Sequence, residues 1–278
     1  MNMRNENLVY SASMLQDFVD CQRRFELKYV LKQSWPSIPV EPVLEIEALM
    51  ARGRQFHFLA HQFFARVPIT TINAAIDDDV LAHWFDHFLD FAQHQDWVRT
   101  LSEIQFGTLI NQHQVIAVYD LVASAGNGQV FIFDWKTSIL PPKKKYLVEK
   151  MQTLIYPFIL FENLPRLFPG FLQEEQRSLS MVYWFPEFPD SSIIFEYDQD
   201  QHQKNSQILV NILNQINIKL ASQQFSCTSD KRKCRFCQYR SLCDRGIIAG
   251  RVDESDTEES SELIEIDFDA LPDMNADI

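Results

Sequence analysis

The stretch that decides the fold is Phe131-Ile132-Phe133-Asp134-Trp135-Lys136, in which two charged side chains stand among large apolar ones. Alternate residues of a β-strand share a face, so Asp134 and Lys136 are expected to project to the same side. The apolar neighbours indicate that the strand is buried, and burial of an unpaired charge is costly. We therefore expect this strand to carry a small site with a chemical role.

Period-two patterns around this stretch predict a sheet. A glycine-containing turn at 124–128 predicts a hairpin between this strand and the one before it. Across that hairpin Asp120 can lie near Asp134, so that two carboxylates converge beside Lys136. The predicted strands cover 101–108, 114–123, 129–136, 180–185 and 192–197.

Helical spacing of apolar residues occupies much of the remaining chain. The first predicted helix has Ser13 as a candidate N-cap. The pattern as a whole predicts an α/β fold, in which a small mixed central sheet is flanked by helices. The predicted helices cover 11–31, 43–66, about 75–98, 145–167 and 201–224.

Charge is distributed unevenly along the 278 residues. The formal net charge of −13 at first argues against a polyanionic partner, but residues 252–278 hold eleven acidic side chains and no Lys or Arg. The other 251 residues hold 27 acidic and 25 basic side chains, so the body is almost neutral. DNA is therefore not excluded as a partner, and the acidic tail is expected to be disordered.

No segment predicts membrane insertion or export. The longest apolar run, 154–161, is interrupted by Pro157 and is far shorter than the roughly 20 residues that span a bilayer. We expect a cytoplasmic protein. Disulfides are rare in that compartment, so clustered cysteines indicate metal or redox chemistry.

The cysteines are clustered near the end of the chain. Cys234, Cys237 and Cys243 follow a C-x2-C-x5-C spacing, which is one ligand short of the usual four. The fourth ligand is either Cys227, which is near in sequence, or Cys21, which is more than two hundred residues away. Spacing alone would allow zinc with Cys227 as the fourth ligand, as in a short zinc ribbon.

Two carboxylates beside a lysine suit a hard divalent cation, Mg²⁺ or Mn²⁺, with open positions for a phosphate and a water. Such a cation lowers the pKa of the water and stabilises charge that develops on phosphorus. Lys136 can orient the water or neutralise the phosphate oxygens.

The order Asp120, hairpin, Asp134-Trp135-Lys136 resembles the PD-(D/E)XK nuclease superfamily, and in particular its RecB-like exonuclease branch. The resemblance implies a restriction-endonuclease-like core. It also implies that His57, from the segment Gly53–His57, is a metal ligand. Ala117 departs from the pattern, because that position more often holds glycine. Further residues carry roles that the resemblance implies: Asp120 and Asp134 as metal ligands with the Trp135 carbonyl, Lys136 as the catalytic lysine, and Gln152 and Tyr156 of a QxxxY motif as residues that support the lysine or contact DNA.

Glu103 and His61 can each be interpreted in two ways. Glu103 lies at the acidic position that opens the sheet in this family, or is a solvated acid at a strand end. His61, one helical turn after His57, is interpreted as a packing residue. A zinc-protease helix would need glutamate directly after the first histidine, where this chain has Phe58.

The cysteines add a second resemblance, to the iron–sulfur nucleases that include the AddB subunit and certain CRISPR-associated nucleases. It implies that Cys21, Cys234, Cys237 and Cys243 bind a 4Fe–4S cluster, in preference to zinc, and that the cluster joins the two ends of the chain. The expected organisation is an N-terminal helix with one cluster ligand, a nuclease core, a cysteine segment and an acidic tail: 1–35, 36–224, 225–250 and 251–278.

The function expected from these features is metal-dependent hydrolysis of DNA, by an exonuclease or an endonuclease acting on single strands or DNA ends. DNA repair, recombination or foreign-DNA processing would be its setting. Basic residues at 143–145 and within 231–245 would bind phosphates without sequence preference. The alternative is a catalytically silent DNA-binding subunit whose partner is a helicase or another repair complex. The chain has no Walker-type phosphate loop with which to translocate by itself.

Overall fold

The computed structural model describes residues 8–34, 43–137, 143–168, 178–235 and 237–246. The acidic tail predicted over 251–278 lies outside these residues. Within the described ranges, no helix has both the length and the apolar character that a membrane span requires.

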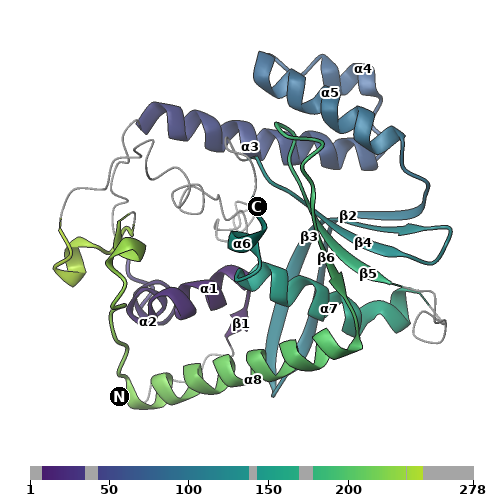
Figure 1. The fold of residues 1–278 in the computed structure, drawn as a ribbon. Helices are drawn as coiled ribbons and strands as arrows, with labels where there is room; N and C mark the ends of the chain where they lie inside the picture. Colours follow the sequence, from purple (N-terminus) through teal and green to yellow (C-terminus); the bar gives the residue numbers. More distant parts are fainter. Residues whose placement is uncertain (1–7, 35–42, 138–142, 169–177, 236, 247–278) are drawn as a thin grey trace, which may run out of the picture.

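A six-stranded mixed sheet forms the centre of the molecule (Figure 1). Its order is β1-β3-β4-β5-β6, and β2 pairs with the other edge of β3. The run β2-β3-β4 is antiparallel, which confirms the predicted hairpins, whereas β4 and β5 are parallel. The two-residue β1, which was not predicted, pairs in parallel with β3. The strands are β1 Val9–Tyr10, β2 Trp97–Ile110, β3 His113–Ala125, β4 Val130–Trp135, β5 Leu179–Trp184 and β6 Ile193–Tyr197.

Helices cover both faces of the sheet, as predicted for the α/β class. In Figure 1, α3, α4 and α5 lie on one side, and α1, α7 and α8 on the other. The helices are α1 Ala12–Asp20, α2 Gln22–Phe25, α3 Val43–Phe64, α4 Ile69–Asn73, α5 Asp79–Gln93, α6 Lys144–Leu147, α7 Met151–Leu167 and α8 Gln199–Ser222. Shorter turns are a π-helix at Glu26–Val30 and 3₁₀ turns at Lys231–Cys234 and Ser241–Cys243.

The prediction of one continuous helix over 11–31 is wrong. Cys21 adopts an extended conformation, with φ −160° and ψ 106°, and this ends α1. The cap is also not the predicted Ser13. Ser11 caps the helix, because its Oγ accepts a hydrogen bond from the Met14 amide at 3.2 Å.

Two other helix predictions are wrong at their boundaries. The helix expected over about 75–98 is α5, which begins after its cap Asp78 and ends at Gln93, so that Trp97 already belongs to β2. The helix expected over 145–167 is two helices, because Lys150 is extended, with ψ 137°, and separates α6 from α7.

Two apolar clusters fill the space on either side of the sheet. One lies under α1, α7 and α8, and the other, which is mainly aromatic, lies under α3 and α5. Alternate residues of β4 enter different clusters: Ile132 packs into the first, and Phe133 and Trp135 into the second. The buried indole of Trp135 therefore fixes the rotation of β4, and Asp134 and Lys136 project toward the opposite face.

The aromatic cluster makes a prediction about stability. Phe88 is completely buried and its ring lies within 6.3 Å of those of Phe56, Trp135 and Trp184. Replacement of Phe88 by alanine should leave a cavity and lower the free energy of unfolding by about 3–5 kcal/mol, as measured by urea denaturation. Phe58→Ala is the control, because that side chain is 58% exposed and its loss should change stability by less than about 0.5 kcal/mol. Equal effects of the two substitutions would contradict the assignment of this core.

Candidate active site at the fork of β3 and β4

The candidate site lies where β3 and β4 separate. Their backbone pairing ends at Leu121 and Phe133, and beyond that point β4 continues beside β5 alone. The carboxylate of Asp120 occupies the fork. Its Oδ2 accepts a hydrogen bond from the backbone amide of Trp135 at 2.7 Å, so a side chain replaces the next backbone contact of the ladder.

β3 changes the direction of its side chains at the same point. Tyr119 packs into the cluster under α7, whereas Leu121, two residues later, packs into the cluster under α3. In a regular strand these two residues would share a face. Asp120 thus lies at a break in the strand pattern, where its carboxylate can reach partners that a regular strand would hide.

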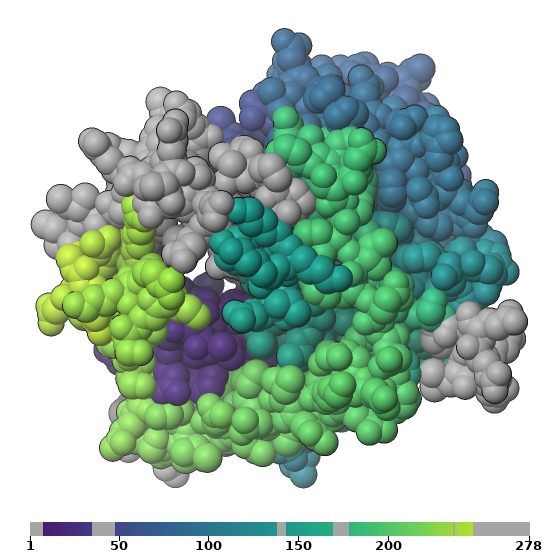
Figure 2. All heavy atoms as spheres, in the orientation of Figure 1, coloured from purple at the N-terminus to yellow at the C-terminus, as the bar shows by residue number. Residues whose placement is uncertain are grey.

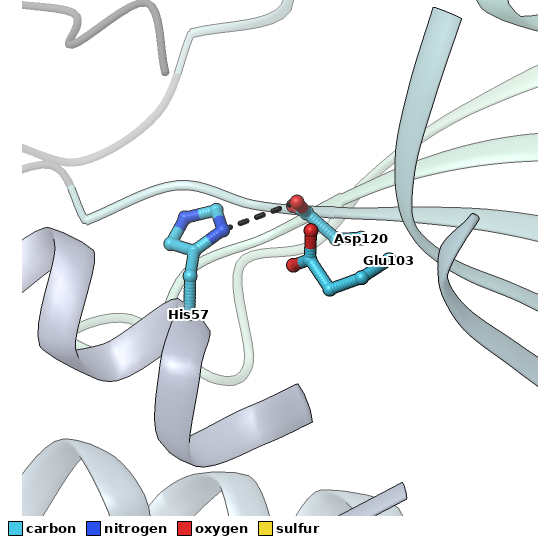
Figure 3. A group of neighbouring side chains, drawn as sticks. All are labelled: His57, Glu103 and Asp120. Carbon is cyan, nitrogen blue, oxygen red and sulfur yellow. Dashed lines mark hydrogen bonds and ion pairs between the residues drawn. The ribbon is translucent and has the colours of Figure 1, made fainter. Parts of the chain in front are cut away.

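His57 approaches Asp120 from α3 (Figure 3). Its Nδ1 lies 3.1 Å from Asp120 Oδ1, and both side chains are mostly buried. The preceding residue, Phe56, is fully buried in the aromatic cluster and fixes the rotation of α3. Packing of the helix therefore directs the imidazole toward the fork.

Glu103 completes a group of three ligand-type side chains. One ligand atom each of His57, Glu103 and Asp120 can be chosen so that all lie within 4.8 Å of one another. Among the described residues, this is the only group of three or more His, Cys, Asp or Glu side chains that meets that limit. Figure 3 shows the Glu103 carboxylate beside the Asp120 carboxylate, and both lie next to the His57 imidazole.

The backbone of Glu103 is strained. Its φ is +49°, in the left-handed region that non-glycine residues seldom adopt. The residue lies inside β2, between pairs of that strand with Leu121 and Tyr119, and not at a strand end. Its side chain is nevertheless exposed, as the alternative interpretation of a solvated acid expected. Such backbone conformations cost of order 1–3 kcal/mol and are concentrated at functional sites.

The charges around His57 favour its protonated form. Burial alone would lower the pKa of the imidazole, but the negative charge and hydrogen bond of Asp120, and then the charges of Asp134 and Glu103, outweigh it and raise that pKa. The surroundings of His57 are therefore strongly negative. A cation bound there would replace the positive charge that the proton otherwise supplies.

A second group forms on the other face of β4. Lys136 Nζ lies 2.9 Å from Asp134 Oδ2 and donates to Gln152 Oε1 at 2.9 Å. Gln152 Nε2 donates in turn to Asp134 Oδ1 at 2.5 Å. The three side chains form a closed ring of contacts, in which Gln152 from the first turn of α7 holds both the carboxylate and the ammonium.

The remaining predicted residues have different positions. Trp135 contributes its amide to Asp120 and its ring to the aromatic cluster. Tyr156 is 2% exposed and packs in the core, where its carbonyl accepts a hydrogen bond from the Tyr119 hydroxyl at 2.9 Å. His61 lies outside the group of three, with Nδ1 2.9 Å from the Ser102 hydroxyl.

All five cysteines line one pocket, in which the two ends of the described chain meet. In Figure 2 the yellow-green C-terminal segment lies beside the purple N-terminal helices. Their backbones are joined by the Arg23 amide, which donates to the Ser226 carbonyl at 3.1 Å. The lining comprises Cys21, Cys227, Cys234, Cys237 and Cys243 with Arg24, Lys233, Tyr239, Arg240 and Arg245.

Crowding of thiols in this pocket opposes their ionisation. Burial, followed by the charge and hydrogen bond of Cys227, raises the pKa of Cys243 to about 12. Burial also raises the pKa values of Cys234 and Cys237. Thiolate ligands must lose their protons when metal binds, so a metal bound here would have to overcome these raised pKa values.

Two solved structures align with most of this chain. A solved structure from Eubacterium rectale, named "Putative exonuclease", aligns with 92% of this chain and 97% of its own, with a TM-score of 0.50 and 9% sequence identity. That likeness indicates a shared fold. A second structure, SSO0001, aligns with 87% of this chain and 88% of its own, with a TM-score of 0.42 and 16% identity. No curated protein sequence matches the chain.

The model of one protein family matches residues 9–244, which include both groups at the fork and all five cysteines. The matched family is described as the PD-(D/E)XK nuclease superfamily. Its match extends over most of the 278 residues, from β1 to the last cysteine. The chain is therefore a member of the PD-(D/E)XK nuclease superfamily.

Proposed function

We propose that the protein is a metal-dependent DNA nuclease, and specifically an exonuclease that acts on DNA ends or single strands. The observation that carries the proposal is the fork itself. There the Asp120 carboxylate accepts the Trp135 amide and the Asp134 carboxylate pairs with Lys136. Asp120, Asp134 and Lys136 are the residues that the family resemblance assigns to phosphodiester hydrolysis. DNA repair, recombination or foreign-DNA processing would be the setting of this activity.

His57, Glu103 and Asp120 are the residues that would hold the cation, with Asp134 and the Trp135 carbonyl as further ligands that the resemblance implies. Oxygen-rich ligand sets suit Mg²⁺ or Mn²⁺. When bound, the cation would supply Lewis acidity and lower the pKa of a water. The negative surroundings of His57 support a cation at this position.

Lys136 is the proposed catalytic residue that faces the phosphate. Asp134 and Gln152 hold its ammonium in place, so the Lys136 side chain loses little conformational entropy when substrate binds. A compact positive charge at that point stabilises the negative charge that grows on the phosphate oxygens. Water adds to phosphorus, the bond from phosphorus to the leaving oxygen breaks, and that oxygen receives a proton.

Basic side chains near the cysteine pocket and on α6 support binding of the DNA backbone. Lys233, Arg240 and Arg245 line the pocket, and Lys143 to Lys145 begin α6 after the catalytic strand. Phosphate contacts of this kind confer affinity without sequence preference. Lys144 also has a structural contact, because its ammonium donates to the Ile194 carbonyl at 2.8 Å.

For the cysteine pocket we propose a 4Fe–4S cluster held by Cys21, Cys234, Cys237 and Cys243. Four basic side chains line the pocket and would balance the charge of thiolate ligands. The preference for a 4Fe–4S cluster over zinc follows from the resemblance to the iron–sulfur nucleases.

The first test of this function is cleavage of end-labelled single- and double-stranded DNA with Mg²⁺ or Mn²⁺. Lys136→Met and Asp134→Asn should each lower the cleavage rate at least about 100-fold, because the first removes the positive charge that faces the phosphate and the second removes a proposed metal ligand. Lys219→Met, on the last turn of α8, is the matched control and should retain the wild-type rate.

The same assay separates the competing functions. Full activity of Lys136→Met and Asp134→Asn would show that the site is assigned wrongly. A wild-type protein that binds DNA but does not cleave it with either metal would instead be the DNA-binding subunit of a larger complex.

Metal affinity tests the role of Glu103. Glu103→Gln keeps the size of the side chain but removes a charged ligand, and should weaken Mn²⁺ binding roughly tenfold or more, measured by the loss of the free-ion electron paramagnetic resonance signal. Asp90→Asn is the control, because that carboxylate is 80% exposed and lies on α5. Unchanged affinity of Glu103→Gln would exclude Glu103 from the metal site.

The colour and metal content of protein purified without oxygen test the cysteine pocket. The proposal expects a brown protein that contains iron and sulfide in equal amounts. Cys21→Ser should lose the cluster and Cys227→Ser should retain it. A colourless protein with one zinc would contradict the iron–sulfur assignment, and the opposite result for the two variants would make Cys227 the fourth ligand.

A further inference from the structure

One hydrogen-bonded path connects the cysteine pocket to the lysine at the fork, and Gln16 of α1 lies at its centre. We propose that Gln16 is a positioning residue, which holds the first turn of α7 so that Gln152 stays against Lys136. The inference rests on the proposed nuclease function for its catalytic consequence, but the contact that it describes is a property of the fold.

The first step of the path is the contact between Gln16 and α7. Gln16 Oε1 accepts a hydrogen bond from the backbone amide of Met151 at 2.9 Å. First-turn amides of a helix have no partner within the helix. The N-cap of α7 is Lys150, whose side chain makes no capping hydrogen bond, so Gln16 supplies the missing acceptor from another helix.

The second step follows from the position of Gln152, which directly succeeds Met151 on that first turn. Its amide group accepts from Lys136 and donates to Asp134. Both hydrogen bonds are made by the Gln152 side chain, so a shift of the first turn of α7 would disturb both at once. Misplacement of a positioning group by about 1 Å can lower a rate about 100-fold.

The third step leads from Gln16 to the cysteine pocket. Gln16 Nε2 donates to Asp20 Oδ1 at 3.2 Å, and Lys233 Nζ donates to the same oxygen at 2.5 Å. Asp20 directly precedes Cys21, and Lys233 directly precedes Cys234. The ion pair therefore ties the two chain ends at the pocket, and Gln16 connects that pair to α7.

Docking of α1 does not require the Gln16 amide group. Leu15 and Phe18 are 0% and 3% exposed and pack into the core beneath the helix. A role limited to stability would therefore change the melting temperature and leave turnover alone. A positioning role would change turnover and leave the fold intact.

The experiment compares Gln16→Leu, Gln16→Glu and the control Gln95→Leu in the full-length protein, purified without oxygen. Gln16→Leu removes the acceptor for Met151, and kcat should fall about tenfold while KM for DNA stays within twofold. Gln16→Glu keeps an acceptor for the Met151 amide, and a negative charge is favourable at a helix N-terminus, but it loses the donor to Asp20. It should therefore recover most, but not all, of the kcat that Gln16→Leu loses. Gln95→Leu removes a half-buried glutamine that donates to the Phe91 carbonyl, and should leave kcat unchanged.

Hydrogen exchange of the first turn of α7 measures the same contact without DNA. Exchange at Met151 and Gln152 should be faster in Gln16→Leu than in wild type, and normal in Gln16→Glu. Lys233→Met interrupts the path at its other end and should lower kcat less than Gln16→Leu. The double variant should be no slower than Gln16→Leu alone, because both act through one path.

Equal exchange in wild type and Gln16→Leu would overturn the inference, and so would a loss of kcat that Gln16→Glu does not largely recover. A wild-type protein that cleaves no DNA with Mg²⁺ or Mn²⁺ would overturn the proposed function instead. The exchange measurement would then decide the inference by itself. Additive losses of kcat for Gln16→Leu and Lys233→Met would show that the cysteine pocket does not act through Gln16.

Discussion

The carboxylate of Asp120 is the contact on which the site depends. A sheet cannot open between two paired strands without leaving backbone groups unpaired, and buried unpaired amides are costly. Here one oxygen of Asp120 accepts the amide of Trp135 just beyond the end of the ladder, and the other faces His57. One side chain therefore both stabilises the opening and belongs to the group that can hold a cation.

The two apolar clusters align the two halves of the site. The aromatic cluster fixes α3 and, through the ring of Trp135, the end of β4, while the other cluster fixes α7 with Gln152. His57 and Gln152 thus reach neighbouring residues of the fork from opposite faces of one sheet. Since β4 carries both Asp134 and the amide bound by Asp120, the two halves share a rigid element, and rigid elements place reactive groups more accurately than loops do.

Local sequence pattern predicted the parts of this arrangement that depend on local chemistry. The alternation of side chains in β4 and the hairpin turn between β3 and β4 follow from strand geometry alone, and the structure has both. The Asp120 carboxylate lies across this hairpin against the Trp135 amide. The break at Cys21 and the left-handed φ of Glu103 could not be predicted, because each depends on contacts with distant segments. The same is true of Gln16, whose partner on α7 is 135 residues away.

The cysteine pocket has a consequence for how the protein is made. Cys21 leaves the ribosome more than two hundred residues before Cys234, Cys237 and Cys243, and the sheet and both clusters are encoded between them. The pocket can therefore be completed only after the catalytic core has been synthesised and has brought the two ends together. A chain that stops just before Cys234 cannot complete the pocket, even though it already holds every strand of the sheet.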